Sequence, residues 1–204
     1  MTRCVLATGN EGKLLEMQTL LGDWPVEIVS QSALGVESPP ETGLTFVENA
    51  LLKARHAAEK TQLPAIADDS GIEVDVLDGA PGIRSARYAG EEATDAENLA
   101  LLLERMHGVP AEARTARFQC VIVALRHAFD PTPLIFSGTW EGRVLHAARG
   151  TNGFGYDPVF GIAESGRSAA ELDSATKNRL SHRAQALLKL TEALPGGLGF
   201  VRYT

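Results

Sequence analysis

The way in which the apolar segments of this chain are joined constrains its fold more than any other feature. Residues 5–8 ("VLAT") form a short continuous apolar run, as expected of a buried strand. A glycine-containing loop at residues 9–13 follows, and apolar residues then recur at helical spacing from Leu14 onward. Residues 26–30 form a second strand-like segment. The chain is therefore predicted to open with a strand, a loop, a helix and a second strand.

Helices are predicted at three further places. A threonine followed three residues later by glutamate is the pattern of a capping box, which marks a helix start. Two such pairs occur, Thr45 with Glu48 and Thr94 with Glu97. Each pair precedes apolar residues at helical spacing. Residues 181–194 have the same spacing and predict a last helix, with Ser181 as its expected N-cap.

The remaining strands are predicted in buried and half-buried forms. Residues 63–71 form a short buried strand that ends in acidic residues, and residues 72–76 alternate apolar and charged side chains as a separate half-buried strand. Residues 117–127 and 133–145 are predicted to be long strands joined by a turn. Because some strands are joined through helices and others through turns, the sequence predicts an α/β fold with a mixed sheet.

Composition and charge exclude several classes of protein. Of the 204 residues, 44% are hydrophobic and 22% are charged, which excludes a disordered chain, a coiled coil and a collagen-like fibre. The net charge of −7 argues against general binding of duplex DNA. The longest apolar run, residues 120–125, is far shorter than the roughly 20 residues of a membrane span. We therefore expect a soluble cytoplasmic protein with neither nucleic acid nor membrane as partner, in which Cys4 and Cys120 are buried, reduced thiols.

The first candidate for chemistry is the turn from Thr8 to Lys13, between a strand and a helix. Backbone N–H groups at a helix N-terminus with a nearby lysine form an anion site. The turn is not a P-loop, because Gly9 and Gly12 are too close together and a leucine follows the lysine. An ordinary glycine-rich turn is the alternative.

The second candidate is an acidic set formed by Glu41, Asp68 and Asp69. The two aspartates end a strand so apolar that their charges are expected to face a cleft or a cation. Mg²⁺ typically takes one or two carboxylates together with substrate phosphates. A solvated turn at Ser70 is the alternative.

The third candidate is the segment "GFGYDP". Its glycines allow the chain to bend closely past a ligand, and Phe154 between them is a candidate for stacking on a base. The alternative is a loop in which Phe154 and Tyr156 pack inward.

The fourth candidate is Lys177 together with His182 and Arg183. Cations in the first turn of a helix oppose the helix dipole, so they are better explained if an anion or a base carbonyl binds there. A helix start with tolerated surface charges is the alternative. Taken together, the four candidates are the groups needed to bind a nucleoside triphosphate.

The sequence resembles the inosine triphosphate pyrophosphatase family, and specifically its bacterial branch. The resemblance covers almost the whole chain and is carried by five segments in a fixed order. These are the pattern Thr8-x-Asn10-x-x-Lys13-x-x-Glu16, "ETGLTFVENALLKARHAA", "AIADDSGIEVDVLDGAPGIRSARYAG", "GFGYDPVF" and "SHRAQAL". One departure is visible: Asn152 stands where the family pattern has glycine, which puts only the local loop geometry in question.

The resemblance implies an elongated mixed β-sheet with flanking helices, in two lobes with the active site in a central cleft. On this basis, residues 1–195 are expected to form one domain of two lobes and residues 196–204 a flexible tail. It also implies a homodimer that requires Mg²⁺ and converts ITP, dITP and XTP to the monophosphate and pyrophosphate, which removes deaminated purines from the nucleotide pool.

The resemblance also implies a role for each candidate residue. Glu41 and Asp69 bind the metal, with Asp68 as a further candidate ligand, and Asp69 is the catalytic proton acceptor. The residues expected to contact substrate are Thr8, Gly9, Asn10, Glu11, Gly12, Lys13, Lys53, Ser70, Phe154, Gly155, Tyr156, Asp157, Lys177, His182 and Arg183.

A mechanism consistent with these residues has a water attack the α-phosphorus while pyrophosphate leaves. A carboxylate of the Asp68–Asp69 pair orients or deprotonates the water, and Lys13 and Lys53 offset charge on the phosphates. Two alternatives stay open: a related pyrophosphatase acting on other modified bases, and a nucleotide sensor without turnover.

Overall fold

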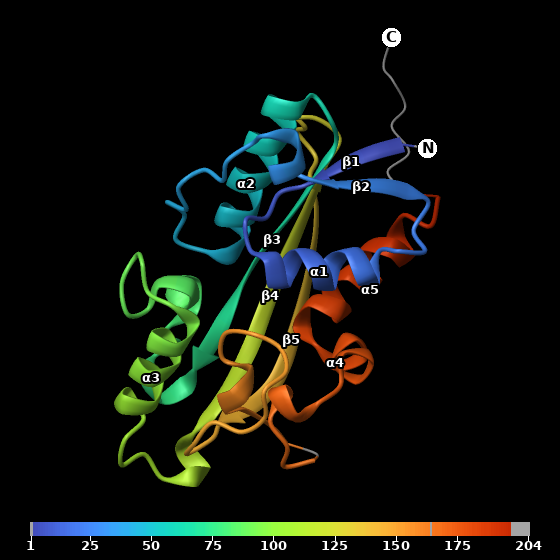
Figure 1. Ribbon diagram of the computed structural model, residues 1–204. Coiled ribbons are helices and arrows are strands. Elements are labelled where there is room, and N and C mark those ends of the chain that lie inside the picture. Colours follow the sequence, from blue (N-terminus) through green and yellow to red (C-terminus); the bar gives the residue numbers. More distant parts are fainter. Residues whose placement is uncertain (1, 164, 197–204) are drawn as a thin grey trace. The chain divides into compact units, whose positions relative to one another are not determined.

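The computed structural model describes residues 2–163 and 165–196 and shows a mixed six-stranded sheet with helices packed on it (Figure 1). The predicted tail at residues 196–204 lies outside these ranges except for its first residue. The strands are β1 (Thr2–Leu6), β2 (Val26–Ser30), β3 (Ala65–Val74), β4 (Thr115–Leu125), β5 (Leu134–Val144) and β6 (Phe160–Ile162). The α-helices are α1 (Glu11–Leu20), α2 (Phe46–Thr61), α3 (Asp95–Arg105), α4 (Ser174–Leu180) and α5 (His182–Ala193). None of the helices in the described ranges is long and apolar enough to cross a bilayer.

The sheet is mixed, as predicted. Its strand order is β2-β1-β3-β4-β5-β6. β1 pairs in parallel with both β2 and β3, whereas β5 pairs with β6 in antiparallel fashion. The α/β fold class expected from the connections between segments is therefore confirmed.

The chain divides into two compact units, each with its own core. The first unit takes its described residues from Met1–Asp69, Cys120–Gly138 and Arg183–Thr204, and the second consists of Ser70–Gln119 and Thr139–His182. The boundary falls within β3, β4 and β5, so these strands contribute residues to both units. The expectation of one domain of two lobes over residues 1–195 stays a prediction.

The strands of the first unit are apolar on both faces because helices cover both faces. Cys4 and Leu6 of β1 pack in one cluster with Met17 of α1 and with α5, while Val5 packs in another with the alanines of α2. Figure 1 shows α1 and α5 on one side of these strands and α2 on the other. Strands covered on both faces have continuous rather than alternating apolar sequences. Cys4 and Cys120 are buried free thiols, as predicted.

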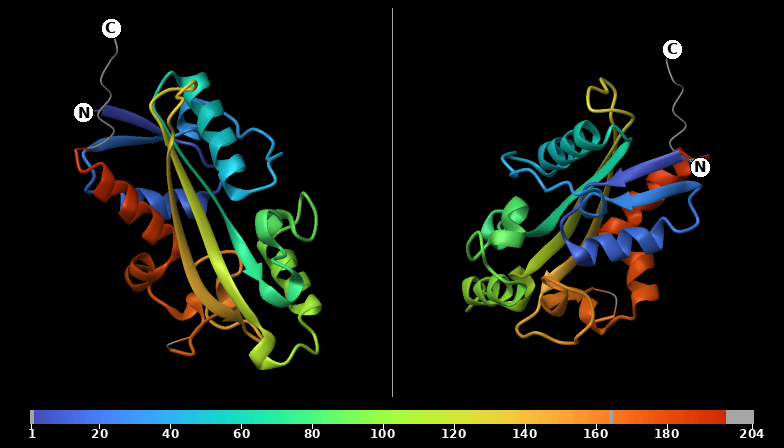
Figure 2. Two further views of the ribbon diagram at one scale, coloured as in Figure 1. Left: turned by 180° about the vertical axis from the view of Figure 1, so that it is seen from behind. Right: turned by 45° about the horizontal axis from the view of Figure 1, so that its top comes forward.

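The second unit buries a core in which α3 packs on the strands. Leu102 of α3 and Met106, directly after that helix, belong to one cluster with Ile72 and Val74 of β3, and aromatic residues of β4, β5 and β6 complete it. Figure 2 shows α3 running alongside β3.

The predicted helix starts are confirmed with two differences in detail. Thr94 and Glu97 form a reciprocal capping box at α3. Thr45 caps α2 by accepting the Glu48 N–H, but the Glu48 carboxylate accepts the N–H of Leu44 rather than that of Thr45. Ser181 has extended dihedral angles immediately before α5, as an N-cap has, but it also ends α4, a helix that the sequence pattern did not predict.

The prediction that Asp68 and Asp69 end a strand is wrong. Residues 65–74 form a single strand, β3, so both aspartates lie inside it and residues 72–76 do not form a separate strand. Ser70 and Gly71, interpreted from sequence as turn residues, continue the extended backbone. The strand continues through these charges because cationic side chains from other elements pair with them.

Candidate functional site

The loop between β1 and α1 is folded by its own side chains. Thr8 Oγ1 accepts the N–H of Asn10 at 3.2 Å, and Asn10 Oδ1 accepts the N–H of Lys13 at 2.9 Å. Asn10 is thereby the N-cap of α1, and Gly9, Asn10 and Glu11 are exposed. The exposed start of α1 has the amide groups and dipole direction that favour an anion.

Lys13, at the end of this loop, belongs to a buried charge network centred on Asp68. The Asp68 side chain is completely buried, and its Oδ2 lies 3.1 Å from Lys13 Nζ and 3.2 Å from a terminal nitrogen of Arg183. Arg183 also pairs with Glu16 of α1. Since a buried charge is tolerated only with partners, Lys13 and Arg183 compensate the burial of the Asp68 carboxylate.

A second ion-pair network surrounds Asp69, the next residue of β3. Lys53 Nζ lies 2.9 Å from Asp69 Oδ1 and 2.7 Å from Glu41 Oε1, so one ammonium bridges the two carboxylates. Asn49 Nδ2 donates to Asp69 Oδ2 at 3.3 Å. Asn49 and Lys53 are one turn apart on α2, so the same helix face supplies both contacts.

The two adjacent aspartates have pKa values shifted in opposite directions. Burial alone would raise the pKa of Asp68, but the charges of Lys13 and Arg183 outweigh it and hold that pKa well below its usual range. Burial raises the pKa of Asp69, and Lys53 and Lys13 offset only part of this effect. A pair of carboxylates with separated pKa values is the pattern in which one serves as a fixed charge and the other accepts a proton.

Glu41 and Asp69 provide the donor atoms that a divalent cation would need. Carboxylate oxygens suit Mg²⁺, and both carboxylates already converge on one cationic group, the Lys53 ammonium. In the part of the chain that the structure describes, no three metal-ligating side chains cluster. The residues therefore fit a metal that takes the rest of its ligands from substrate phosphates and water rather than from a full protein cage. Asp68 is already paired with two cations and is a less suitable ligand.

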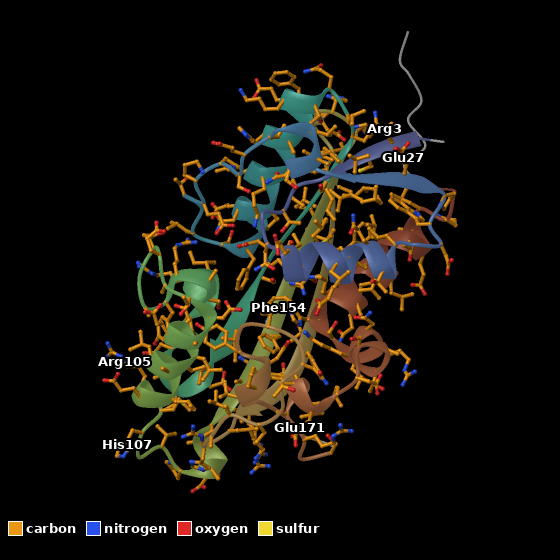
Figure 3. All side chains as sticks on the ribbon, viewed as in Figure 1. Arg3, Glu27, Arg105, His107, Phe154 and Glu171 are labelled. Carbon is orange, nitrogen blue, oxygen red and sulfur yellow. The ribbon has the colours of Figure 1, made fainter. Side chains whose placement is uncertain are left out.

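In the second unit, the predicted aromatic segment forms a compact loop between β5 and β6. Asp157 Oδ2 accepts hydrogen bonds from the Phe154 N–H at 3.0 Å and from Lys177 Nζ at 2.5 Å. The Lys177 ammonium also lies 4.9 Å from the centre of the Phe154 ring, a cation–π distance. Figure 3 labels Phe154 on this loop. Asn152, the departure from the family pattern, donates to the Leu172 carbonyl and so anchors the start of the loop.

Tyr156 and His182 are buried in the core of the second unit. The Tyr156 hydroxyl donates to the Ser85 carbonyl at 2.8 Å, and the ring is buried. Tyr156 therefore packs inward, which is the alternative given above for the "GFGYDP" segment. The His182 ring stacks on Phe118 with the ring centres 4.8 Å apart.

The predicted site residues thus form two groups, one in each unit. The first contains the Thr8–Lys13 loop with Glu41, Lys53, Asp68, Asp69 and Arg183, and the second contains residues 154–157 with Lys177 and His182. Ser70 follows Asp69 in β3 and is the first residue of the second unit. Arg183, expected to contact substrate, has its guanidinium against Asp68 and Glu16. The roles of all these residues toward substrate stay predictions.

Sequence reasoning missed the supporting residues of both groups. Asn49 and Glu16 were not recognised as parts of the charge networks, and Phe118 was not recognised beside His182. Asn49 and Lys53 lie one turn apart on a helix whose other buried residues are alanines, and this spacing could have indicated that both bind the same partner. Nothing local to Phe118 indicates which ring it stacks on.

Comparisons with known proteins agree over nearly the whole chain. The model of the Ham1 family matches residues 4–193. A dITP/XTP pyrophosphatase of Photobacterium profundum is 60% identical over 95% of this chain and 98% of its own length. A dITP/XTP pyrophosphatase of Escherichia coli is 59% identical over 97% of this chain and 100% of its own length.

A solved structure has the same fold. A HAM1 protein from Coxiella burnetii superimposes with a TM-score of 0.88 at 49% identity, covering 96% of this chain and 99% of the other.

Proposed function

The chain belongs to the Ham1 family, and on that premise we propose that it hydrolyses dITP, ITP and XTP to the corresponding monophosphate and pyrophosphate. The observation that carries this proposal is the identity of about 60% to relatives named dITP/XTP pyrophosphatase, extending over nearly the full length of both chains. The protein is thus a nucleoside-triphosphate pyrophosphatase, a hydrolase that cleaves the bond between the α- and β-phosphates. It clears deaminated purines from the nucleotide pool.

The first group of site residues supports a role at the phosphates. The start of α1 and the ammonium of Lys13 bind the triphosphate, and the buried carboxylate of Asp68 holds Lys13 in place. A water attacks the α-phosphorus, a new P–O bond forms, and the α–β P–O bond breaks as pyrophosphate leaves. Asp69 accepts the proton of the water, a role that its raised pKa supports.

Lys53 orients this base. Its ammonium is held between Asp69 and Glu41, so both carboxylates have fixed positions before substrate binds. Such fixed charges stabilise charge that develops in a transition state without reorganisation during the reaction.

The second group of site residues supports a role at the base. The Phe154 ring stacks on a purine, which supplies affinity for every purine base. The Lys177 ammonium, shared between Asp157 and the Phe154 ring, holds that ring in position. Rejection of ATP requires donor groups facing the purine 6-carbonyl, because adenine carries an amino group at that place.

The metal in this proposal is Mg²⁺, held by Glu41 and Asp69 with the substrate phosphates. When bound, it neutralises phosphate charge and lowers the pKa of a coordinated water. The resemblance to the inosine triphosphate pyrophosphatase family also supports a homodimer in the cytoplasm, and the mass of the protein in solution tests the dimer.

Product analysis tests the function. The protein is incubated with dITP and Mg²⁺, and nucleotides and pyrophosphate are separated by anion-exchange chromatography. We expect dIMP and pyrophosphate in equal amounts, no reaction in EDTA, and much lower specificity constants for ATP and GTP. Accumulation of dIDP with inorganic phosphate would refute the cleavage site. Binding of dITP without products would favour a sensor, and faster cleavage of another modified nucleotide would favour a related pyrophosphatase.

A further inference from the structure

The loop that carries Phe154 depends on hydrogen bonds for its shape. Gly153 and Gly155 flank Phe154 with φ angles of 74° and 59°, in the left-handed region that glycine adopts without strain. Glycine also has the greatest backbone freedom of any residue in the absence of other constraints. The loop backbone that carries the Phe154 ring is therefore held in shape by the groups that bind it.

Three residues of this loop are held by partners from different places. The Phe154 N–H donates to the Asp157 carboxylate at 3.0 Å, within the loop. The Tyr156 side chain is fixed by the Ser85 carbonyl. Between them, the Gly155 N–H donates to Asp95 Oδ2 at 2.8 Å, a hydrogen bond to a residue 60 positions away in the sequence.

Asp95 reaches this loop from a well-anchored helix start. It is the first residue of α3, and the capping box of Thr94 and Glu97 fixes the backbone on either side of it. Within the same turn, Asn98 accepts the Ala89 N–H and donates to the Ala86 carbonyl. A carboxylate in the first turn of a helix is also favoured by the helix dipole.

These contacts join three segments of the second unit: the start of α3, residues 85–89 and the Phe154 loop. Asn98 ties α3 to residues 86–89, the neighbouring Ser85 carbonyl holds Tyr156, and Asp95 holds Gly155. The start of α3 and the Phe154 loop are thus linked at both Gly155 and Tyr156. Loss of the Asp95 carboxylate would leave the Gly155 N–H to solvent, so the backbone at the residue after Phe154 would lose its long-range hydrogen bond.

We propose that Asp95 is a positioning residue for the purine base, acting through the Gly155 N–H to hold the Phe154 loop in its binding conformation. This inference rests on the proposed function, since it takes Phe154 to stack on the base. Asp95 itself contacts neither base nor phosphate. Its removal should weaken substrate binding in the ground state and the transition state alike, which raises KM and leaves kcat unchanged.

The test compares Asp95→Ala with Asp95→Asn and Glu104→Ala. For dITP, Asp95→Ala should raise KM about tenfold, the effect of one lost charge-assisted hydrogen bond, with kcat within about twofold. Asp95→Asn keeps an oxygen that accepts the Gly155 N–H and should restore most of the affinity. Glu104→Ala removes an exposed acidic side chain from a later turn of the same helix and alters neither the capping box nor the loop, so it should leave KM unchanged.

Two further measurements separate positioning from a merely structural role. In a Phe154→Ala background, Asp95→Ala should have no further effect on KM, because its effect passes through the ring. Hydrogen exchange of the peptide containing residues 154–157, which requires no substrate, should be at least about tenfold faster in Asp95→Ala than in wild type.

An unchanged KM for Asp95→Ala, an equal rise in KM for Glu104→Ala, or unchanged exchange in the loop would each overturn the inference. A wild-type protein that leaves dITP intact would count against the proposed function instead. In that case the exchange measurement alone decides whether Asp95 fixes the loop.

Discussion

Asp68 and Asp69 are neighbours in one strand, yet the same isosteric change should have different consequences at the two positions. Asp68→Asn removes the charge that pairs with Lys13 and Arg183 while keeping the shape of the side chain. Asp69→Asn removes a carboxylate whose charged form burial already disfavours, and Lys53 keeps Glu41 as its partner. We therefore expect the first substitution to reduce mainly stability and the second to reduce mainly turnover.

The expected sizes follow from burial. Removing one partner of a buried ion pair costs about 3–5 kcal/mol. For 204 residues, an unfolding entropy near 2.1 cal/mol/K per residue amounts to about 0.43 kcal/mol/K, so the Tm of Asp68→Asn should fall by about 7–12 °C. Asp69→Asn should shift the Tm by less than about 3 °C and reduce kcat by about 10²–10⁴-fold, the usual contribution of a general base.

Differential scanning calorimetry gives the Tm, and release of pyrophosphate from dITP at saturating Mg²⁺ gives kcat. Each variant is the matched control of the other, since the chemical change is identical and the positions are adjacent. The reasoning fails if Asp69→Asn loses as much Tm as Asp68→Asn, or if Asp69→Asn keeps half of the wild-type kcat.

Three further predictions concern other residues. Lys13→Ala should weaken dITP binding and slow pyrophosphate release, whereas Lys189→Ala, at an exposed lysine late in α5, should match wild type. Equal losses in the two variants would mean that the phosphate site lies elsewhere. Arg114→Met removes the donor that binds four main-chain carbonyls. Urea titration should therefore show a loss of about 3 kcal/mol in the free energy of unfolding, while KM for dITP stays unchanged. A loss below about 1 kcal/mol would contradict this. Hydrogen bonds from Arg126 hold the pKa of Asp130 well below its usual range, so this carboxylate stabilises the fold at neutral pH and loses that effect as the pH falls below about 4. The stability difference between wild type and Asp130→Asn should therefore shrink between about pH 4 and pH 2, and a pH-independent difference would refute the assignment.

Several features of this protein could be predicted from the sequence because they depend on residues close together in the chain. The N-caps at Thr45 and Thr94 and the turn before α1 are formed by side chains that bind main-chain groups within three residues of themselves. The continuous apolar runs of β1 and β4 reflect burial, and helical spacing revealed α2 and α5. The mixed character of the sheet followed from how these segments are connected.

The sequence also provided the members of the candidate site, chiefly through five ordered segments shared with one family. It could not show what each member contacts. Asp68 and Asp69 are indistinguishable in the sequence, and only their partners, Lys13 and Arg183 for one and Lys53 for the other, separate their pKa values.

Tertiary structure alone decided the features that depend on distant residues. β3 continues through two aspartates because cations from α1, α2 and α5 neutralise them, and no local rule for turn residues contains that information. Arg183 lies 115 positions from Asp68, and Asp95 lies 60 from Gly155. Such pairings are set by the packing of helices on the sheet, which brings the partners together only once the chain has folded.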